Sequence, residues 1–144
     1  MLNSEEPFSG SNGTHRAALC GMPPHDLIER TRRFSLAVLK FGRRLPRTSE
    51  ANEAGCQLRR AASSVRSNYR AARKGRSRAE FEAKLGIVWE EADECVDWLE
   101  FLRDARIKDD PAMLDESRQL ARIFAQSVKT ARENTTRIKK RPKS

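Results

Sequence analysis

The chain is poor in the residues on which most metal and catalytic sites are built. Of its 144 residues, two are histidines and three are cysteines. His15 and His25 lie at or before the start of the first predicted helix. A di-iron bundle needs Glu-x-x-His motifs on two helices, and a catalytic triad needs a histidine base, so we reject both. The cysteines lack zinc-site spacing and are expected to be reduced thiols.

Long apolar runs and strand signals are also missing. No segment approaches the roughly 20 apolar residues that span a bilayer, and the mean hydropathy is -0.76. The first 25 residues lack the apolar core of a signal peptide, so we expect a cytoplasmic protein with no membrane contact. β-branched residues form few runs, which argues against strands. No P-loop or GxGxxG motif occurs.

What the sequence has is helical periodicity. Apolar residues recur at alternating steps of three and four in four segments. The first helix is expected from Asp26 to Pro46 and the second from Glu50 to Arg73. Ser77 and Glu80 form a capping box for the third, and Pro111 suits the first turn of the fourth. The predicted core seams are Leu27, Thr31, Phe34, Val38, Phe41 and Leu45; Ala54, Leu58, Ala61, Val65, Tyr69 and Ala72; Phe81, Leu85, Val88, Ala92, Cys95, Leu99 and Leu102; and Leu114, Ser117, Ala121, Phe124, Val128, Ala131, Thr135 and Ile138.

Four amphipathic helices with short connections predict an all-α, up-down-up-down four-helix bundle over residues 26–138. Residues 1–25 are rich in Ser, Gly, Asn and Pro and are expected to be disordered. Met22 is an alternative start of the native protein. Residues 139–144 form a basic tail.

The net charge of +9 is divided into blocks. Residues 26–80 carry a net charge of +10 and residues 117–144 carry +8, whereas residues 81–116 carry -8. Blocks of this kind pair within a fold, pair between subunits, or bind a polyanion.

The densest basic block is Gln57–Arg78, which contains no acid. At 100° per residue, four of its arginines fall in a narrow arc beside the predicted seam. We call these four, Arg59, Arg66, Arg70 and Arg73, the arginine stripe. The remaining basic residues extend the candidate nucleic-acid-binding patch; they are Arg60, Lys74, Arg76 and Arg78.

Two interpretations of the stripe remain open. It can contact phosphates, giving salt-sensitive binding with little sequence preference. Alternatively, its arginines form salt bridges with the acidic face of the third helix, within the fold or across an interface, in a structural or adaptor protein. That face carries Glu90, Asp93, Glu94 and Asp97.

The acids themselves do not form a recognisable catalytic site. Glu90, Glu91 and Glu94 could support acid-base chemistry, but a solvated acidic face is commoner, and a hydrolase using Glu91 or Glu94 is the weakest hypothesis. We predict a non-enzymatic protein without metal or cofactor. Asn68 is expected to make a polar contact within the bundle rather than bind a ligand.

The run QLRRAASSVRSNYRAARKGRSRAEFEAKLGIVWEEADE resembles the four-helix-bundle family of 23S rRNA-intervening-sequence proteins. That family has a Gln-x-x-Arg-Ala-x-x-Ser-x-x-x-Asn signature followed by Ser-x-x-Glu-Phe. The matching residues here are Gln57, Arg60, Ala61, Ser64, Asn68, Ser77, Glu80 and Phe81. The resemblance covers roughly residues 26–138. It departs from the family at residues 69–72, where many members have Ile-Ala-Glu-Gly and this chain has Tyr-Arg-Ala-Ala.

The family is similar in fold to the accessory variability determinant of diversity-generating retroelements. That resemblance implies a homo-oligomer, favours a pentamer, and suggests nucleic acid and a reverse transcriptase as partners. The flanking Trp89 and Trp98 widen the apolar face of the third helix, which agrees with oligomerisation. This chain lacks the glutamate of the family's Ile-Ala-Glu-Gly and has an added arginine, so the stripe is more basic than in a typical member. We therefore infer no role of that glutamate for this chain.

Overall fold

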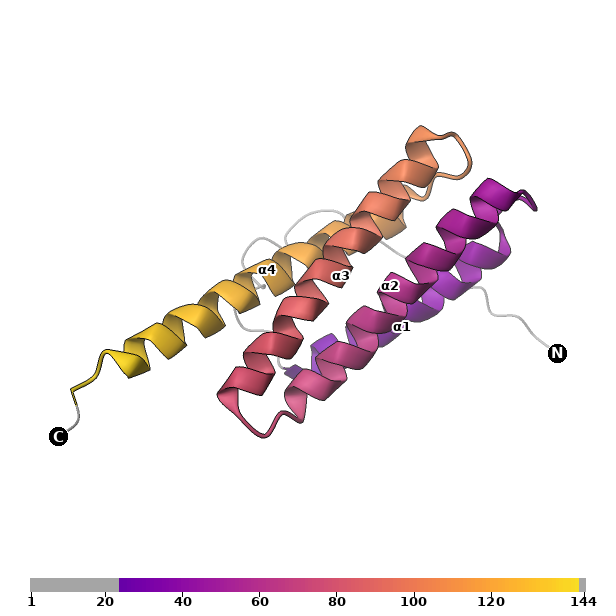
Figure 1. Ribbon diagram of the computed structural model, residues 1–144. Helices are drawn as coiled ribbons and strands as arrows, with labels where there is room; N and C mark the ends of the chain where they lie inside the picture. The colour runs from indigo at the N-terminus through magenta and orange to yellow at the C-terminus, as the bar shows by residue number, and fades with distance from the viewer. Residues whose placement is uncertain (1–23, 143–144) are drawn as a thin grey trace.

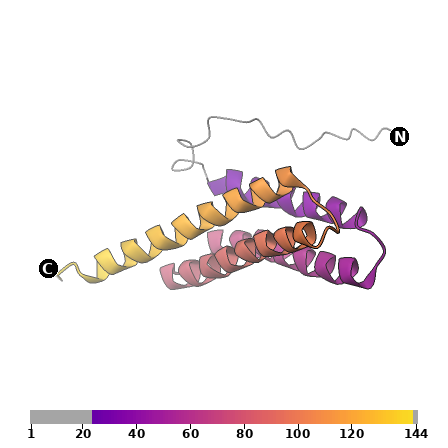
Figure 2. The ribbon, with the colours of Figure 1, turned by 90° about the horizontal axis from the view of Figure 1, so that it is seen from above.

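The computed structural model describes residues 24–142, which form four helices. They are α1 (Pro24–Arg43), α2 (Ser49–Arg73), α3 (Arg78–Asp104) and α4 (Pro111–Lys139). Consecutive helices run antiparallel and are joined by short turns (Figure 1). Seen from above, α2 and α3 form one side of the bundle and α1 and α4 the other (Figure 2). The predicted all-α four-helix bundle is confirmed.

Side-chain caps define where three of the helices begin. Thr48 Oγ1 accepts a hydrogen bond from Ala51 N at 3.2 Å, Ser77 Oγ accepts one from Glu80 N at 3.1 Å, and Asp110 Oδ1 accepts one from Met113 N at 3.0 Å. These bonds satisfy N–H groups that have no partner within the helix. The expected Ser77 cap is therefore present. The Glu80 carboxylate, however, accepts from the N–H of residue 76 at 2.9 Å rather than from that of the cap residue.

The core is built from the predicted seams, with differences near the ends of α1 and α4. Ile138 is 52% exposed, contrary to its predicted place in the core. α4 has 29 residues and α1 has 20, or about 43 and 30 Å at 1.5 Å per residue, so the last turns of α4 run past their neighbours (Figure 1). α1 ends three residues before Pro46, so Leu45 lies beyond the helix, where it is partly buried against the core. Met113 and Leu120 are buried core residues that the periodicity did not identify.

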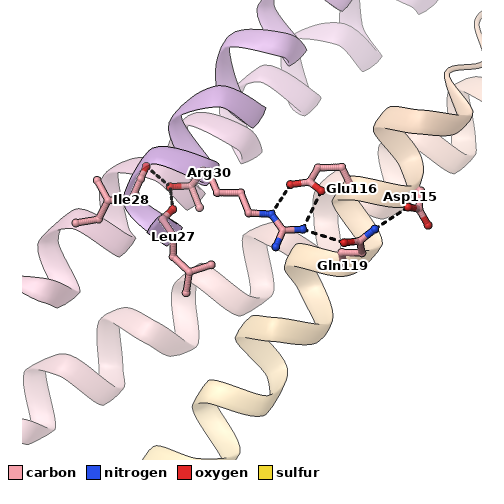
Figure 3. A network of polar contacts seen from close by, with 7 residues as sticks. Leu27, Ile28, Arg30, Asp115, Glu116 and Gln119 are labelled. Atoms are coloured by element: carbon pink, nitrogen blue, oxygen red, sulfur yellow. Dashed lines mark hydrogen bonds and ion pairs between the residues drawn. The ribbon is translucent and has the colours of Figure 1, made fainter. Parts of the chain in front are cut away.

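A charged clamp closes the bundle between its first and last helices. Arg30 Nε and Nη2 donate to the two carboxylate oxygens of Glu116 at 2.6 and 2.9 Å, and Nη2 also donates to Gln119 Oε1 at 3.0 Å. Gln119 is held in turn by Asp115 (Figure 3). The Arg30 and Glu116 side chains are only 19% and 13% exposed. The bidentate, shielded geometry makes this a strong ion pair.

Some expectations fall outside the described part of the chain. Residues 1–25, for which disorder is expected, lie almost wholly outside the described residues 24–142. The alternative start at Met22 lies outside them as well. Within residues 24–142, no helix is long and apolar enough to cross a membrane. Cys56 and Cys95 are free thiols.

The clamp generates a prediction about stability. Glu116→Gln leaves the Arg30 guanidinium partly buried without its counter-charge, and we expect the free energy of unfolding to fall by about 2 kcal/mol. Urea unfolding measures this loss. The control is Glu29→Gln, because Glu29 is 50% exposed in its pairs with Arg32 and Arg33 and should change stability by less than about 0.5 kcal/mol. Equal effects of the two variants would contradict a special role for the clamp.

Candidate nucleic-acid interface

The arginine stripe lies along the edge of α2 that faces α1. Arg59 and Arg66 are half-buried, while Arg70 and Arg73 are exposed. The contact at Gly42 shows that this edge of α2 faces α1. An added Cβ on Gly42, which belongs to α1, would lie 3.6 Å from the Arg59 Cδ atom. The predicted arc is therefore a continuous basic edge beside the α1–α2 contact.

The stripe has no acidic partner in the described part of the protein. Ion pairs there use other arginines, such as Arg30, Arg44 and Arg118. None involves the stripe or the extending residues, which are Arg60, Lys74, Arg76 and Arg78. All four extending residues are exposed, and the last three lie around the α2–α3 turn, away from the middle of the stripe.

The acidic face of α3 lies beyond the opposite edge of α2. α3 packs against the side of α2 that does not face α1 (Figure 2). Glu90, Asp93, Glu94 and Asp97 are exposed, and none forms an ion pair with another described residue. The hypothesis that these acids neutralise the stripe within one fold therefore fails for residues 24–142, because the width of α2 separates the two charged surfaces.

Arg59 is the most constrained arginine of the stripe. Its Nη2 atom donates to the Cys56 Sγ atom at 2.9 Å, one turn earlier on α2. Its aliphatic stem lies beside Gly42, where an added Cβ would be at ordinary contact distance, 3.6 Å from the Arg59 Cδ atom. A guanidinium held in this way loses less rotamer freedom when it binds an anion.

Tyr69 is not available as a base-stacking platform. Its side chain is 5% exposed, and its ring packs against Phe124 on α4 with centroids 5.3 Å apart. Burial raises the pKa of its phenol, and the nearby Arg73 charge partly offsets this effect. Recognition at this edge would therefore rely on charge rather than on stacking.

The turn between α1 and α2 places two further arginines beside Arg59, at one end of the stripe. Arg43 and Arg47 line the same surface hollow as Arg59. They precede α2 and so lie outside the patch predicted from the sequence. The basic run GRRLPR over residues 42–47 could have identified them from the sequence, because a short turn must place it beside the first half of the next helix.

Three polar residues of the family-like signature lie on the other edge of α2, about 160° from Arg59 at 100° per residue. Asn68 Nδ2 donates to the Ser64 backbone oxygen at 3.0 Å and to the Ser64 hydroxyl at 2.9 Å. The Asn68 amide thus has partners within its own helix rather than on a neighbouring one. Gln57 lies on this edge as well and is half-buried.

The acid-rich helix has no arrangement that activates a nucleophile. Burial raises the pKa of the Cys95 thiol, and the charges of Glu91 and Glu94 raise it further, so the thiol stays protonated and unreactive. Glu94 accepts a hydrogen bond from Trp98 Nε1 at 3.1 Å. Among the residues described, no group of three His, Cys, Asp or Glu side chains could hold a metal ion.

Comparison with known proteins identifies the family. The model of the 23S rRNA-intervening sequence protein family matches residues 25–129. The chain belongs to this family. No curated protein matches the sequence.

A solved structure has the same fold as this member of the 23S rRNA-intervening sequence protein family. It is a protein with unknown function from the S23 ribosomal protein family of Bacteroides thetaiotaomicron VPI-5482. It superposes with a TM-score of 0.66 at 24% sequence identity, covering 75% of this chain and 99% of the other. At that identity the likeness shows the fold alone. The expected similarity to the accessory variability determinant stays a prediction.

Because the stripe arginines have no ion-pair partner among the described residues, we expect them to contribute little to the stability of the fold. Replacing Arg66 and Arg70 together by Gln removes like charges four residues apart on α2, so thermal stability should be unchanged or rise slightly, by a few tenths of a kcal/mol. Thermal unfolding followed by circular dichroism measures this. Arg30→Gln, which breaks the clamp, is the destabilising control. A clear drop in melting temperature for the double variant would show that the stripe has a structural partner.

Proposed function

We propose that this protein is a non-enzymatic accessory protein that binds nucleic acid through the arginine stripe. The observation that carries the proposal is a row of four arginines on one edge of α2, none of them in an ion pair with another described residue. Like charges so close together repel one another. A bound polyanion would relieve that repulsion.

The length of the stripe suits a nucleic-acid strand. Arg59 and Arg73 are 14 positions apart, or about 21 Å along the helix axis. At about 3.4 Å per nucleotide of one duplex strand, this length spans roughly six phosphates. Four arginines along it can therefore each meet a phosphate without demanding a sharply bent strand.

The chemistry favours binding with little sequence preference. Guanidinium groups on phosphates position a strand but carry no sequence information, and the buried Tyr69 ring offers no stacking surface. The family name refers to 23S rRNA, and the structural relative is assigned to a ribosomal protein family. Both names support RNA as the first nucleic acid to test. A reverse transcriptase partner remains a prediction based on resemblance.

The binding test is a salt titration with labelled single-stranded RNA, followed by fluorescence anisotropy. If four phosphates are contacted, the logarithm of the binding constant should fall with the logarithm of salt concentration with a slope of about -3. The double variant Arg66→Gln with Arg70→Gln should make this slope shallower by about 1.4.

A matched control keeps the net charge equal. Arg122 and Arg132 are exposed on α4 and form no ion pair with another described residue. Changing both to Gln removes the same two charges from a helix diagonal to α2 (Figure 2). The control should keep a slope near the wild-type value. Equal losses in the two double variants would mean that only net charge matters, and no binding at low salt would reject the proposal.

A second candidate function is a structural or adaptor role in which the stripe binds an acidic protein surface, including that of another subunit. The supporting observation is the acidic face of α3, which is exposed beside partly exposed apolar side chains: Ile87, Trp89 and Phe101 are 38%, 37% and 52% exposed. Light scattering of the Arg66, Arg70 double variant distinguishes the candidates. A smaller assembly than that of the wild type would favour the adaptor role. The pentamer suggested by resemblance stays a prediction for the same measurement.

A further inference from the structure

An open hollow lies at the turn between α1 and α2, where the arginine stripe begins. Its volume is about 470 Å³, within the range of small-ligand sites. The end of α1, the turn and the first three turns of α2 all contribute to its wall. The residues that line it include Arg43, Arg47 and Arg59 and no Asp or Glu.

The three guanidinium groups are not neutralised by the fold. None of them forms an ion pair with a residue in the described range 24–142. The neighbouring Arg44 behaves differently: it lies 3.9 Å from the Asp110 carboxylate and does not line the hollow. The start of α2 is already capped by the Thr48 hydroxyl, so the positive charge of the hollow comes from the arginine side chains.

The wall is shaped by close packing as well as by charge. An added Cβ at Gly55 would lie 2.6 Å from the Leu45 Cδ1 atom, so the turn packs closely against α2 at this glycine. The Arg59 stem lies beside Gly42, where an added Cβ would be at ordinary contact distance. Arg43 and Arg47 of one segment line the same hollow as Arg59 of another.

We propose that this hollow binds the terminal phosphate of a nucleic-acid strand whose following phosphates lie on the stripe. The inference rests on the proposed function, because Arg59 belongs to both surfaces. A terminal phosphomonoester carries a charge of about -1.5 to -2 at pH 7, whereas an internal phosphodiester carries -1. Three arginines lining one hollow match the higher charge, and the stripe offers only single arginines along a line. The hollow lies at the Arg59 end of the stripe, where a strand end would lie.

The test compares three versions of one internally labelled single-stranded RNA, carrying a 5′-phosphate, a 3′-phosphate or hydroxyls at both ends. One of the phosphorylated ends should bind about tenfold more tightly than the hydroxyl-ended strand, as expected for an added charge-assisted contact. Which end gains affinity gives the direction of the strand. Anisotropy at near-physiological salt measures all three affinities.

Arg47→Gln isolates the hollow, because Arg47 is exposed and is not part of the stripe. It should abolish the gain from the terminal phosphate and change the affinity for the hydroxyl-ended strand by less than about threefold. Arg44→Gln, which removes a charge from the same turn but not from the hollow, should keep the gain. Unchanged melting temperatures would show that both variants are folded.

The outcomes separate this inference from the proposed function. Equal affinity of wild-type protein for all three strands would overturn the terminal-phosphate site and leave the stripe in place. A gain that persists in Arg47→Gln would do the same. Failure of every strand to bind, even at low salt, would overturn the proposed function and the site together.

Discussion

The small-residue seam of α2 is the constraint on which the rest of the structure depends. Five of its buried positions are alanines, at residues 51, 54, 61, 62 and 72. Small side chains allow neighbouring helices to approach closely, and larger ones such as Phe34, Phe41 and Phe124 complete the core from α1 and α4. Once this seam is buried, the arginines beside it have only one place to lie, which is the edge next to α1.

Burying that seam also separates the charges of the molecule. The basic edge of α2 and the acidic face of α3 lie on opposite sides of one helix. Attraction between them within one subunit is therefore weak, because charges at the surface and far apart are screened by salt. A protein with two unneutralised surfaces of opposite sign is suited to steering a charged partner toward one of them. Within residues 24–142, the fold thus gives the stripe no acidic partner and does not use it for stability.

Stability comes instead from the core and from a few polar contacts between helices. The Arg30–Glu116 clamp joins the two helices that are furthest apart in the sequence, and Arg118 Nη2 donates to Glu100 Oε1 at 2.6 Å between α4 and α3. Thr135 of α4 also donates to Glu82 of α3. These contacts use arginines and acids outside the stripe. The charged side chains that hold the helices together are therefore different from those proposed to bind nucleic acid.

The sequence by itself determined the four helices, most of the core and the arc of the arginine stripe. Each of these follows from local periodicity, because residues three and four apart share a helix face whatever packs against it. It also indicated the Ser77 cap, which depends on neighbouring residues alone. It could not show that Ile138 is exposed, since that depends on where the partners of α4 end.

Only the tertiary structure decided which charges meet. The clamp between Arg30 and Glu116 joins residues 86 positions apart, and no local pattern distinguishes those two from the other arginines and glutamates of the chain. The direction in which the stripe faces, toward α1 and away from the acids of α3, likewise depends on which edge of α2 each neighbour covers. The hollow lined by Arg43, Arg47 and Arg59 forms where the turn after α1 packs against the start of α2. Side chains from separate segments become neighbours only when the helices pack.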